Sequence, residues 1–287
     1  MADKNLSYPR GKERLNANKI NSFFNLRILI FILLISGEKI YISNQVLSEI
    51  SLIIEGNGNS NQPVINDGFY VEPYQVFVNG VEHSECIKTC ELPEGRNNVI
   101  LKFNVQIDFC TMMFYGLNYI KEIDLSNFDA SLVQNMNWMF RDCSNLEKIY
   151  FGNIVTSSVD DIYGLFQGCS NLTSIDLSNF DFPKVRNMAA MFMGCSNLEQ
   201  VNFGTSTTPL LECVLTMFQG CTKLKSIDLS NFDFSHVNSF YGMFSGCESL
   251  ETVNFGNIDT SLVEDMGIMF ANCSNLISMD SSIKCLR

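Results

Sequence analysis

The residues best suited to chemistry in this sequence are cysteines at one fixed spacing. They stand 26 residues apart, at Cys143, Cys169, Cys195, Cys221, Cys247 and Cys273. Such a column could bind a metal or form disulfides. If the residues stack on neighbouring strands, however, they lie about 4.8 Å apart, which exceeds the Cβ separation of about 3.8 Å that a disulfide needs. We therefore expect buried thiols that pack as small hydrophobic groups.

A second column at the same spacing is polar and forms a candidate binding face. Its members are Asp124, Tyr150, Asp176, Asn202, Asp228 and Asn254. Apolar residues flank each of them, so we expect these side chains to point outward from a strand. The face could dock a basic partner, a glycan or a cation, or it could simply keep a sheet solvated. Calcium needs six to eight oxygens around one ion, and aspartates two coils apart lie about 10 Å from each other. We therefore expect no metal site here.

Few other residues in the sequence could form a covalent link or take part in a reaction. Cys86 and Cys90 could form one disulfide in an oxidising compartment. Asn171 and Asn272 each begin an Asn-x-Ser/Thr glycosylation acceptor. We find no Ser-His-Asp set, phosphate-binding loop or metal-ligand cluster, and the chain has 2 histidines. We therefore expect neither catalysis nor a cofactor.

The elements that position these columns follow from the repeat itself. Thr173 to Ser178 alternate between polar and apolar residues, as in a strand with one buried face. Apolar residues then recur every three or four positions, as at Val185, Met188 and Phe192, which favours a short helix. A glycine column that includes Gly168 and Gly194 is typical of helix C-termini. The interpretation is an α/β solenoid of about six to seven coils, with a parallel sheet on one side and a helical wall on the other.

The repeat also alternates with a period of 52 residues. Odd repeats contain Ile-Asp-Leu-Ser-Asn-Phe-Asp, as at 175–181, and even repeats contain Val-Asn-Phe-Gly, as at 201–204. Duplication of a two-coil unit explains this pattern. It also places large side chains beside small ones in neighbouring coils.

The chain divides into four segments by composition. Residues 38–110 have the alternation of a small β-rich domain, with a hairpin at Asn79-Gly80. We expect this domain to cap the first coil, the alternative being an independent ligand-binding module. The solenoid occupies 111–281, and 282–287 form a tail.

The remaining segment, 1–37, has the layout of a signal peptide or signal anchor. Residues 1–27 carry 6 basic and 2 acidic side chains, and an apolar run extends from Ile28 to Ile35. That run is shorter than the roughly 20 residues that span a bilayer; the alternative is a buried strand or helix start. We expect a secreted or cell-surface protein that contacts a membrane only through an uncleaved anchor.

The net charge of −12 excludes two classes of partner. Nucleic acids and anionic membrane surfaces both require clustered Lys and Arg side chains.

The motif Met-Phe-x-Gly-Cys-Ser-Asn-Leu, followed by Ile-Asp-Leu-Ser-Asn-Phe-Asp, is clearest at 165–181 and 191–203. It resembles the 26-residue repeat of BspA-like leucine-rich-repeat surface proteins and covers residues 113–281. The resemblance implies a right-handed, leucine-rich-repeat-like stack and a surface protein engaged in adhesion or host contact. It implies no particular ligand.

Three functions remain open. The first is binding of a protein or glycan through the repeated face. The second is a structural or self-assembling protein whose uncovered last coil stacks on another copy. The third is an intracellular leucine-rich-repeat scaffold whose N-terminal apolar run belongs to the core.

The compartment is testable at the N-terminus. We expect mass spectrometry of the mature protein to show cleavage near Gly37 or a chain retained at the membrane. An intact Met1 on a soluble cytosolic chain would contradict secretion.

Overall fold

The structure, a computed structural model, describes residues 46–58 and 61–277. The chain divides into two compact units, 1–44 and 45–287, and all described residues belong to the second. These residues form strands joined by turns, with no helix among them. The proposed signal segment, 1–37, lies outside the described residues, and so does the tail.

The segment before the repeats is β-rich, as its sequence predicts. Its strands are β1 (Ser48–Gly56), β2 (Gln62–Pro63), β3 (Gln75–Val78), β4 (Val81–Glu82), β5 (Thr89–Cys90) and β6 (Gly95–Phe103). The predicted hairpin is confirmed: Val78 faces Val81 across Asn79 and Gly80, which have φ angles of 52° and 83°. Both central residues of a tight type I′ hairpin turn need positive φ, which favours Asn-Gly.

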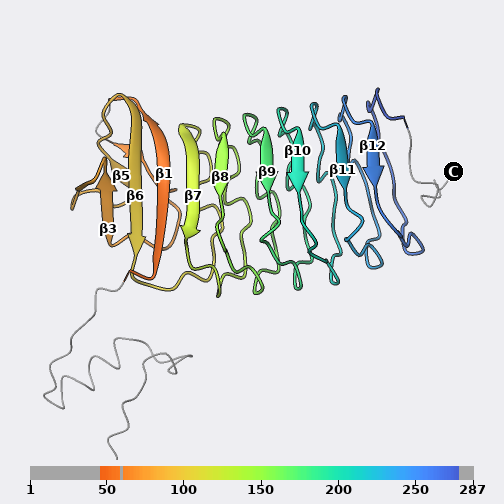
Figure 1. Cartoon of the computed structure of the whole chain (residues 1–287), viewed down its shortest axis with the longest axis horizontal. Helices are drawn as coiled ribbons and strands as arrows, with labels where there is room; N and C mark the ends of the chain where they lie inside the picture. The colour runs from red at the N-terminus through yellow and green to blue at the C-terminus, as the bar shows by residue number, and fades with distance from the viewer. Residues whose placement is uncertain (1–45, 59–60, 278–287) are drawn as a thin grey trace, which may run out of the picture. The chain divides into compact units, whose positions relative to one another are not determined.

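The cap and the first coils share one sheet of six strands, in the order β4-β3-β6-β1-β7-β8. Strand β1 lies between β6 and β7 (Ile120–Asn127) and runs antiparallel to both. It therefore occupies the edge of β7 that no preceding coil could cover (Figure 1). An uncovered strand edge would expose unpaired backbone groups.

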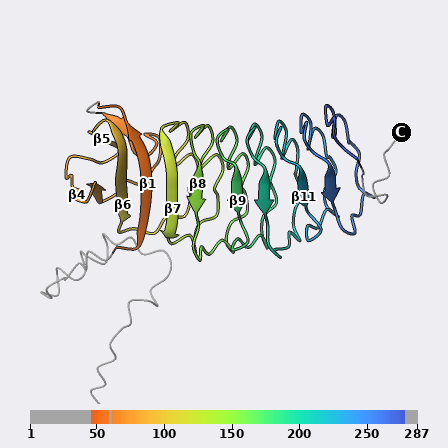
Figure 2. The same ribbon diagram turned by 45° about the horizontal axis from the view of Figure 1, so that its top comes forward.

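Each repeat contributes one strand to the same side of the stack (Figures 1 and 2). After β7 these are β8 (Lys148–Tyr150), β9 (Ser174–Asp176), β10 (Gln200–Asn202), β11 (Ser226–Asp228) and β12 (Thr252–Asn254). The strands pair in parallel as β7 with β8, β9 with β10, and β11 with β12. The period of 52 residues in the sequence is thus the period of strand pairing.

The predicted helical wall is wrong, and a run of tight turns takes its place. Within a coil, the Met139 and Arg141 N–H groups donate to the carbonyls three residues earlier. The N–H groups between them donate to the next coil, Trp138 to the Tyr163 carbonyl at 2.9 Å and Phe140 to Leu165 at 3.0 Å. Turns closed over three residues return side chains to one face every three or four positions. They therefore reproduce the apolar spacing of a helix.

Positive φ angles make this backbone path possible. On the turn side, two positions per coil adopt them, as at Trp138 and Asp142 in one coil and Gly164 and Gly168 in the next. The glycine column therefore does mark left-handed residues, although they close turns and not helices. Where the column lacks glycine, Asp142 and Asn272 occupy it, and both residue types tolerate this conformation.

The core is a line of stacked rings along the solenoid. Phe140, Phe166, Phe192, Phe218 and Phe244 are buried, and successive ring centroids lie 5.4 Å apart with ring planes within 12° of parallel. Each ring belongs to a separate coil. A coil therefore buries its own apolar face only when its neighbours are in place.

Close backbone contact explains why the two repeat types alternate. Gly204 has a φ of +61°, and a Cβ built there would lie 2.8 Å from the Cα of Ser178. Gly152 and Gly256 meet Ser126 and Ser230 in the same way. Between pairs a side chain makes the link instead, since Asn231 Nδ2 donates to the Gly204 carbonyl at 3.2 Å.

Replacing this glycine tests the close contact. Gly204→Ala should lower the free energy of unfolding by about 3 kcal/mol, from left-handed strain and overpacking together. Gly220→Ala is the matched control: its φ is +76°, but its nearest neighbour would lie 3.7 Å away, so only about 1 kcal/mol should be lost. Urea unfolding measures both. Equal losses would show that the close contact with Ser178 does not affect the free energy of unfolding.

Candidate binding face

The predicted polar column lies on one outward face of the strands. Asp124, Tyr150, Asp176, Asn202, Asp228 and Asn254 are all exposed, one on each of β7 to β12. The apolar residue before each is buried or half-buried. The alternation of the sequence therefore places these side chains as predicted.

Aspartate and asparagine in this column are joined within each strand pair. Asp176 Oδ1 accepts hydrogen bonds from the Ser178 N–H and from Asn202 Nδ2, both at 3.0 Å. These bonds stabilise the charged carboxylate, so the bonds from Ser178, assisted by Asn202, lower the pKa of Asp176. Asp228 repeats the arrangement, accepting from Ser230 at 2.9 Å and from Asn254 at 3.0 Å. The side chains are thus held in fixed positions.

A shallow hollow of about 540 Å³ opens on this face across β9, β10 and β11. Its polar lining consists of Ser174, Asp176, Glu199, Gln200, Asn202, Ser226 and Asp228. It therefore brings together three members of the predicted column. Asp124, Tyr150 and Asn254 lie on the same face but outside the lining.

The place of the hollow was not predicted from the sequence. It lies where β10 and β11 belong to different two-stranded sheets. The 52-residue period was the signal for this discontinuity. Periodicity alone could not show which strand junction would be bonded and which would stay open.

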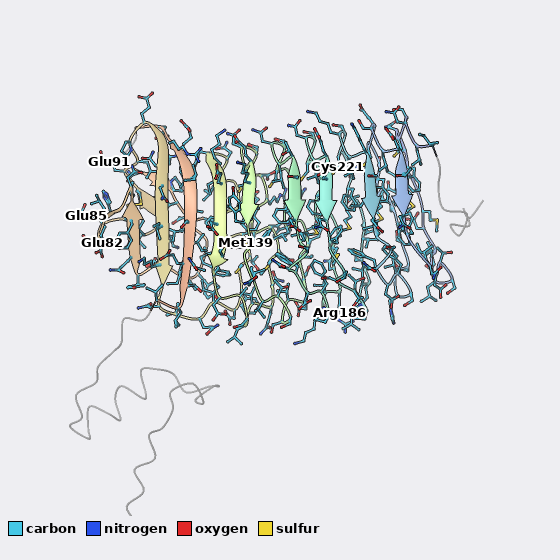
Figure 3. All side chains as sticks on the ribbon, viewed as in Figure 1. Glu82, Glu85, Glu91, Met139, Arg186 and Cys221 are labelled. Carbon is cyan, nitrogen blue, oxygen red and sulfur yellow. A yellow bond between two sulfur atoms is a disulfide. The ribbon has the colours of Figure 1, made fainter. Side chains whose placement is uncertain are left out.

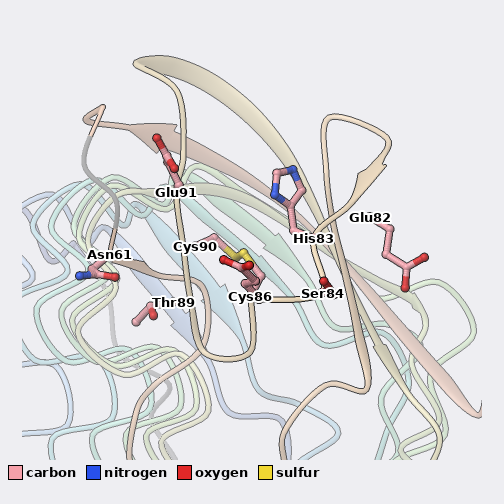
Figure 4. A pocket seen from close by; sticks show the side chains of 9 residues that line it. Asn61, Glu82, His83, Ser84, Cys86, Thr89, Cys90 and Glu91 are labelled. Atoms are coloured by element: carbon pink, nitrogen blue, oxygen red, sulfur yellow. A yellow bond between two sulfur atoms is a disulfide. The ribbon is translucent and has the colours of Figure 1, made fainter.

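A second hollow, of about 450 Å³, lies on the cap (Figure 4). Glu82, Glu85 and Glu91 contribute carboxylates to it, and Figure 3 shows them at the end of the cap away from the coils. Cys86 and Cys90 also line it, and the structure joins them by a disulfide. Within 46–58 and 61–277 no group of three or more His, Cys, Asp or Glu side chains is arranged to hold a metal ion.

The two glycosylation acceptors differ in their surroundings. Asn171 is half-buried, and its Nδ2 donates to Asn145 Oδ1 at 3.3 Å. Asn272 is exposed and has a φ of 61°. The Asn171 amide is thus held in the stack by the neighbouring coil.

The cysteine column is a ladder of free thiols, as predicted from its spacing. Each Sγ donates to the carbonyl of a phenylalanine in the preceding coil, for example Cys195 to Phe166 at 3.0 Å. Burial raises the pKa of Cys143, Cys195 and Cys247 to about 12. The five thiols from Cys143 to Cys247 are buried, and Cys273 is half-buried. Neutral, buried thiols are poor nucleophiles and poor metal ligands.

Trp138 packs on the turns between neighbouring coils. Its ring centroid lies 5.2 Å from that of Tyr163. Its indole also covers Gly164 in the next coil, where a built Cβ would lie 2.7 Å from Trp138 Cδ1. A side chain at position 164 would therefore displace the indole.

Comparison with family models gives two successive matches, at residues 108–208 and 203–284, to the family described as "Mycoplasma protein of unknown function, DUF285". The chain belongs to this family. The DUF285 matches include β7 to β12 and the whole candidate face, whereas the hollow on the cap lies outside them. No curated protein and no solved structure matches the chain.

Membrane-spanning helices were sought in the part of the chain that the structure describes. There, no helix is long and apolar enough to cross a bilayer. The apolar run at 28–35 falls outside that part.

The thiol ladder should make the folded protein less stable at alkaline pH. Because the folded-state pKa of Cys195 is raised to about 12, the unfolded chain loses this proton first as the pH rises. The stability that this thiol contributes should therefore be fully present below about pH 8 and be lost between about pH 9 and 12. Cys195→Ala should cost about 1 kcal/mol near pH 7, from the lost contact and hydrogen bond, and should flatten this decline.

Urea unfolding at a series of pH values measures both effects. Thiol labelling at pH 8, read for each cysteine by mass spectrometry, is the independent check, since the five buried thiols from Cys143 to Cys247 should react only when the chain unfolds. Rapid labelling of these five in the native protein would contradict the buried ladder.

Proposed function

We propose that this protein is a secreted or cell-surface repeat protein that binds a macromolecular partner through its outward sheet face, in adhesion or cell contact. The hollow across β9, β10 and β11 carries the proposal. It is concave, it combines side chains from three coils, and the hydrogen bonds of Asp176 and Asp228 hold its carboxylates in place. Stacked repeats commonly bind through one such repeated face.

The charge of the face limits its partners. The lining contains three carboxylates and no Lys or Arg, and the whole chain carries a net charge of −12. Anionic partners would be repelled. A neutral or basic surface on a protein or glycan fits this face.

Two features of the sequence support the location. The motif at 165–181 and 191–203 resembles that of BspA-like leucine-rich-repeat surface proteins, and residues 1–37 have the layout of a secretory signal. Attachment through an uncleaved anchor would hold the same face outside the cell.

A second candidate function is assembly by end-to-end stacking of copies. The last described coil carries the exposed apolar side chains Leu262, Ile268 and Ile277, with Ile277 79% exposed. Light scattering over a concentration series separates this function from the first, since a strict monomer excludes assembly.

Charge reversal tests the binding face. The full chain should bind a component of a cell-surface or extracellular-matrix panel, and Asp176→Lys with Asp228→Lys should reduce this binding at least about tenfold. The matched control is Asp160→Lys with Glu264→Lys, which changes the net charge equally at exposed positions outside the strands. Equal loss in both variants, or no loss in the first, would reject the face as the site.

A further inference from the structure

The sheet of the solenoid is interrupted between β10 and β11. Within the flanking pairs, Asn202 lies opposite Asp176, and Asp228 lies opposite Asn254. Between 200–202 and 226–228, by contrast, the structure has no backbone–backbone hydrogen bond, and the two strands belong to separate sheets. We call this junction the seam.

The seam leaves polar groups without a protein partner. Backbone groups along the facing edges of β10 and β11 do not pair with each other, and such groups require another partner. The side chains of Ser174, Gln200 and Ser226 make no hydrogen bond with any described residue. Asp228 accepts its bonds from Ser230 and Asn254 at Oδ1, which leaves its Oδ2 available.

We propose that the seam binds a neutral oligosaccharide. This inference rests on the proposed function and specifies the ligand of the same face. Each sugar hydroxyl both donates and accepts hydrogen bonds. It can therefore donate to a free carboxylate oxygen and accept from the Gln200 amide. A sulfated or sialylated chain would place its charge beside Asp176, Glu199 and Asp228, with no Lys or Arg in the lining.

The dimensions and the neighbouring residue fit a chain of sugar rings. The hollow measures about 540 Å³ and spans three strands, a distance of about 10 Å at the usual strand spacing. Its volume falls in the range of ligand sites. Tyr150, 47% exposed, occupies the same outward column on β8. Its ring offers an apolar surface on which the C–H face of a sugar can pack.

A basic peptide fits these groups less well. Lysine and arginine side chains carry no hydrogen-bond acceptor. They would therefore neutralise the carboxylates, but only the peptide backbone could accept from the Gln200 amide and the seam N–H groups, whereas every sugar hydroxyl can accept. A buried donor without a partner is costly. Neutral lining residues, namely Ser174, Gln200, Asn202 and Ser226, outnumber the charged ones.

The experiment measures binding of the immobilised full chain to three sets of probes. These are neutral oligosaccharides of glucose, galactose, mannose and N-acetylglucosamine, a sulfated heparin-derived oligosaccharide, and a peptide of alternating Lys and Ser. At least one neutral oligosaccharide should bind saturably. Gln200→Ala with Ser226→Ala should weaken that binding about tenfold, the effect of roughly 1.4 kcal/mol.

The matched control is Gln134→Ala with Thr252→Ala, whose exposed side chains lie outside the hollow. It should leave the affinity within about twofold of the parent. Thermal unfolding of each variant confirms that it folds.

Several outcomes overturn the inference. These are binding of only the sulfated probe, binding of only the basic peptide, or neutral-sugar binding that both double variants weaken equally or neither weakens. If no sugar binds but the charge reversal at Asp176 and Asp228 still abolishes attachment to a protein, the oligosaccharide is rejected and the proposed function stands. If neither sugars nor the surface panel bind, both are rejected.

Discussion

The structure depends on one constraint, which is that each coil must satisfy its backbone hydrogen bonds in the next coil. Alternate N–H groups on the turn side, such as those of Trp138, Phe140 and Asp142, donate to carbonyls 25 residues ahead in the chain. A coil with one residue more or fewer would misplace every donor. This explains why the phenylalanine spacing of 26 holds from Phe114 to Phe270 without an insertion. The stacked rings and the thiol ladder are consequences of the same register.

Neighbouring coils are less continuously hydrogen-bonded on the strand side than on the turn side, and the candidate site lies on the strand side. Turn-side bonds continue across the junctions, for example from Gly194 to Gln219 and from Gly220 to Ser245. On the strand side, close contact through Gly204 draws β9 and β10 together, while side-chain hydrogen bonds, such as that of Asn231, join this pair to the next beyond the strand ends. Because the turns already hold the stack, the strand junction between pairs can stay open. A concave polar surface can therefore exist on an otherwise regular solenoid.

Sequence reasoning succeeded where a local rule determines the outcome. Alternation placed Asp176 and Asn202 outward and Ile175 inward, since successive strand side chains point to opposite faces. Asn79-Gly80 predicted its hairpin because both residues tolerate positive φ. The prediction of a helix failed because apolar residues spaced three and four positions apart occur both in helices and in successive three-residue turns. Only the acceptors of the backbone N–H groups distinguish the two structures. The Phe140 N–H donates to the carbonyl of Leu165, which lies in another coil.

The sequence by itself determined the repeat, its register, the buried columns and the outward polar face, because each follows from which residue types recur at which spacing. The tertiary structure alone decided that the coils contain no helix within the described residues, that strands pair two by two, and that a hollow opens between β10 and β11. These features depend on how closely neighbouring backbones approach. That distance is set by contacts such as Gly204 against Ser178, between residues 26 positions apart, which no pattern within a single coil can express.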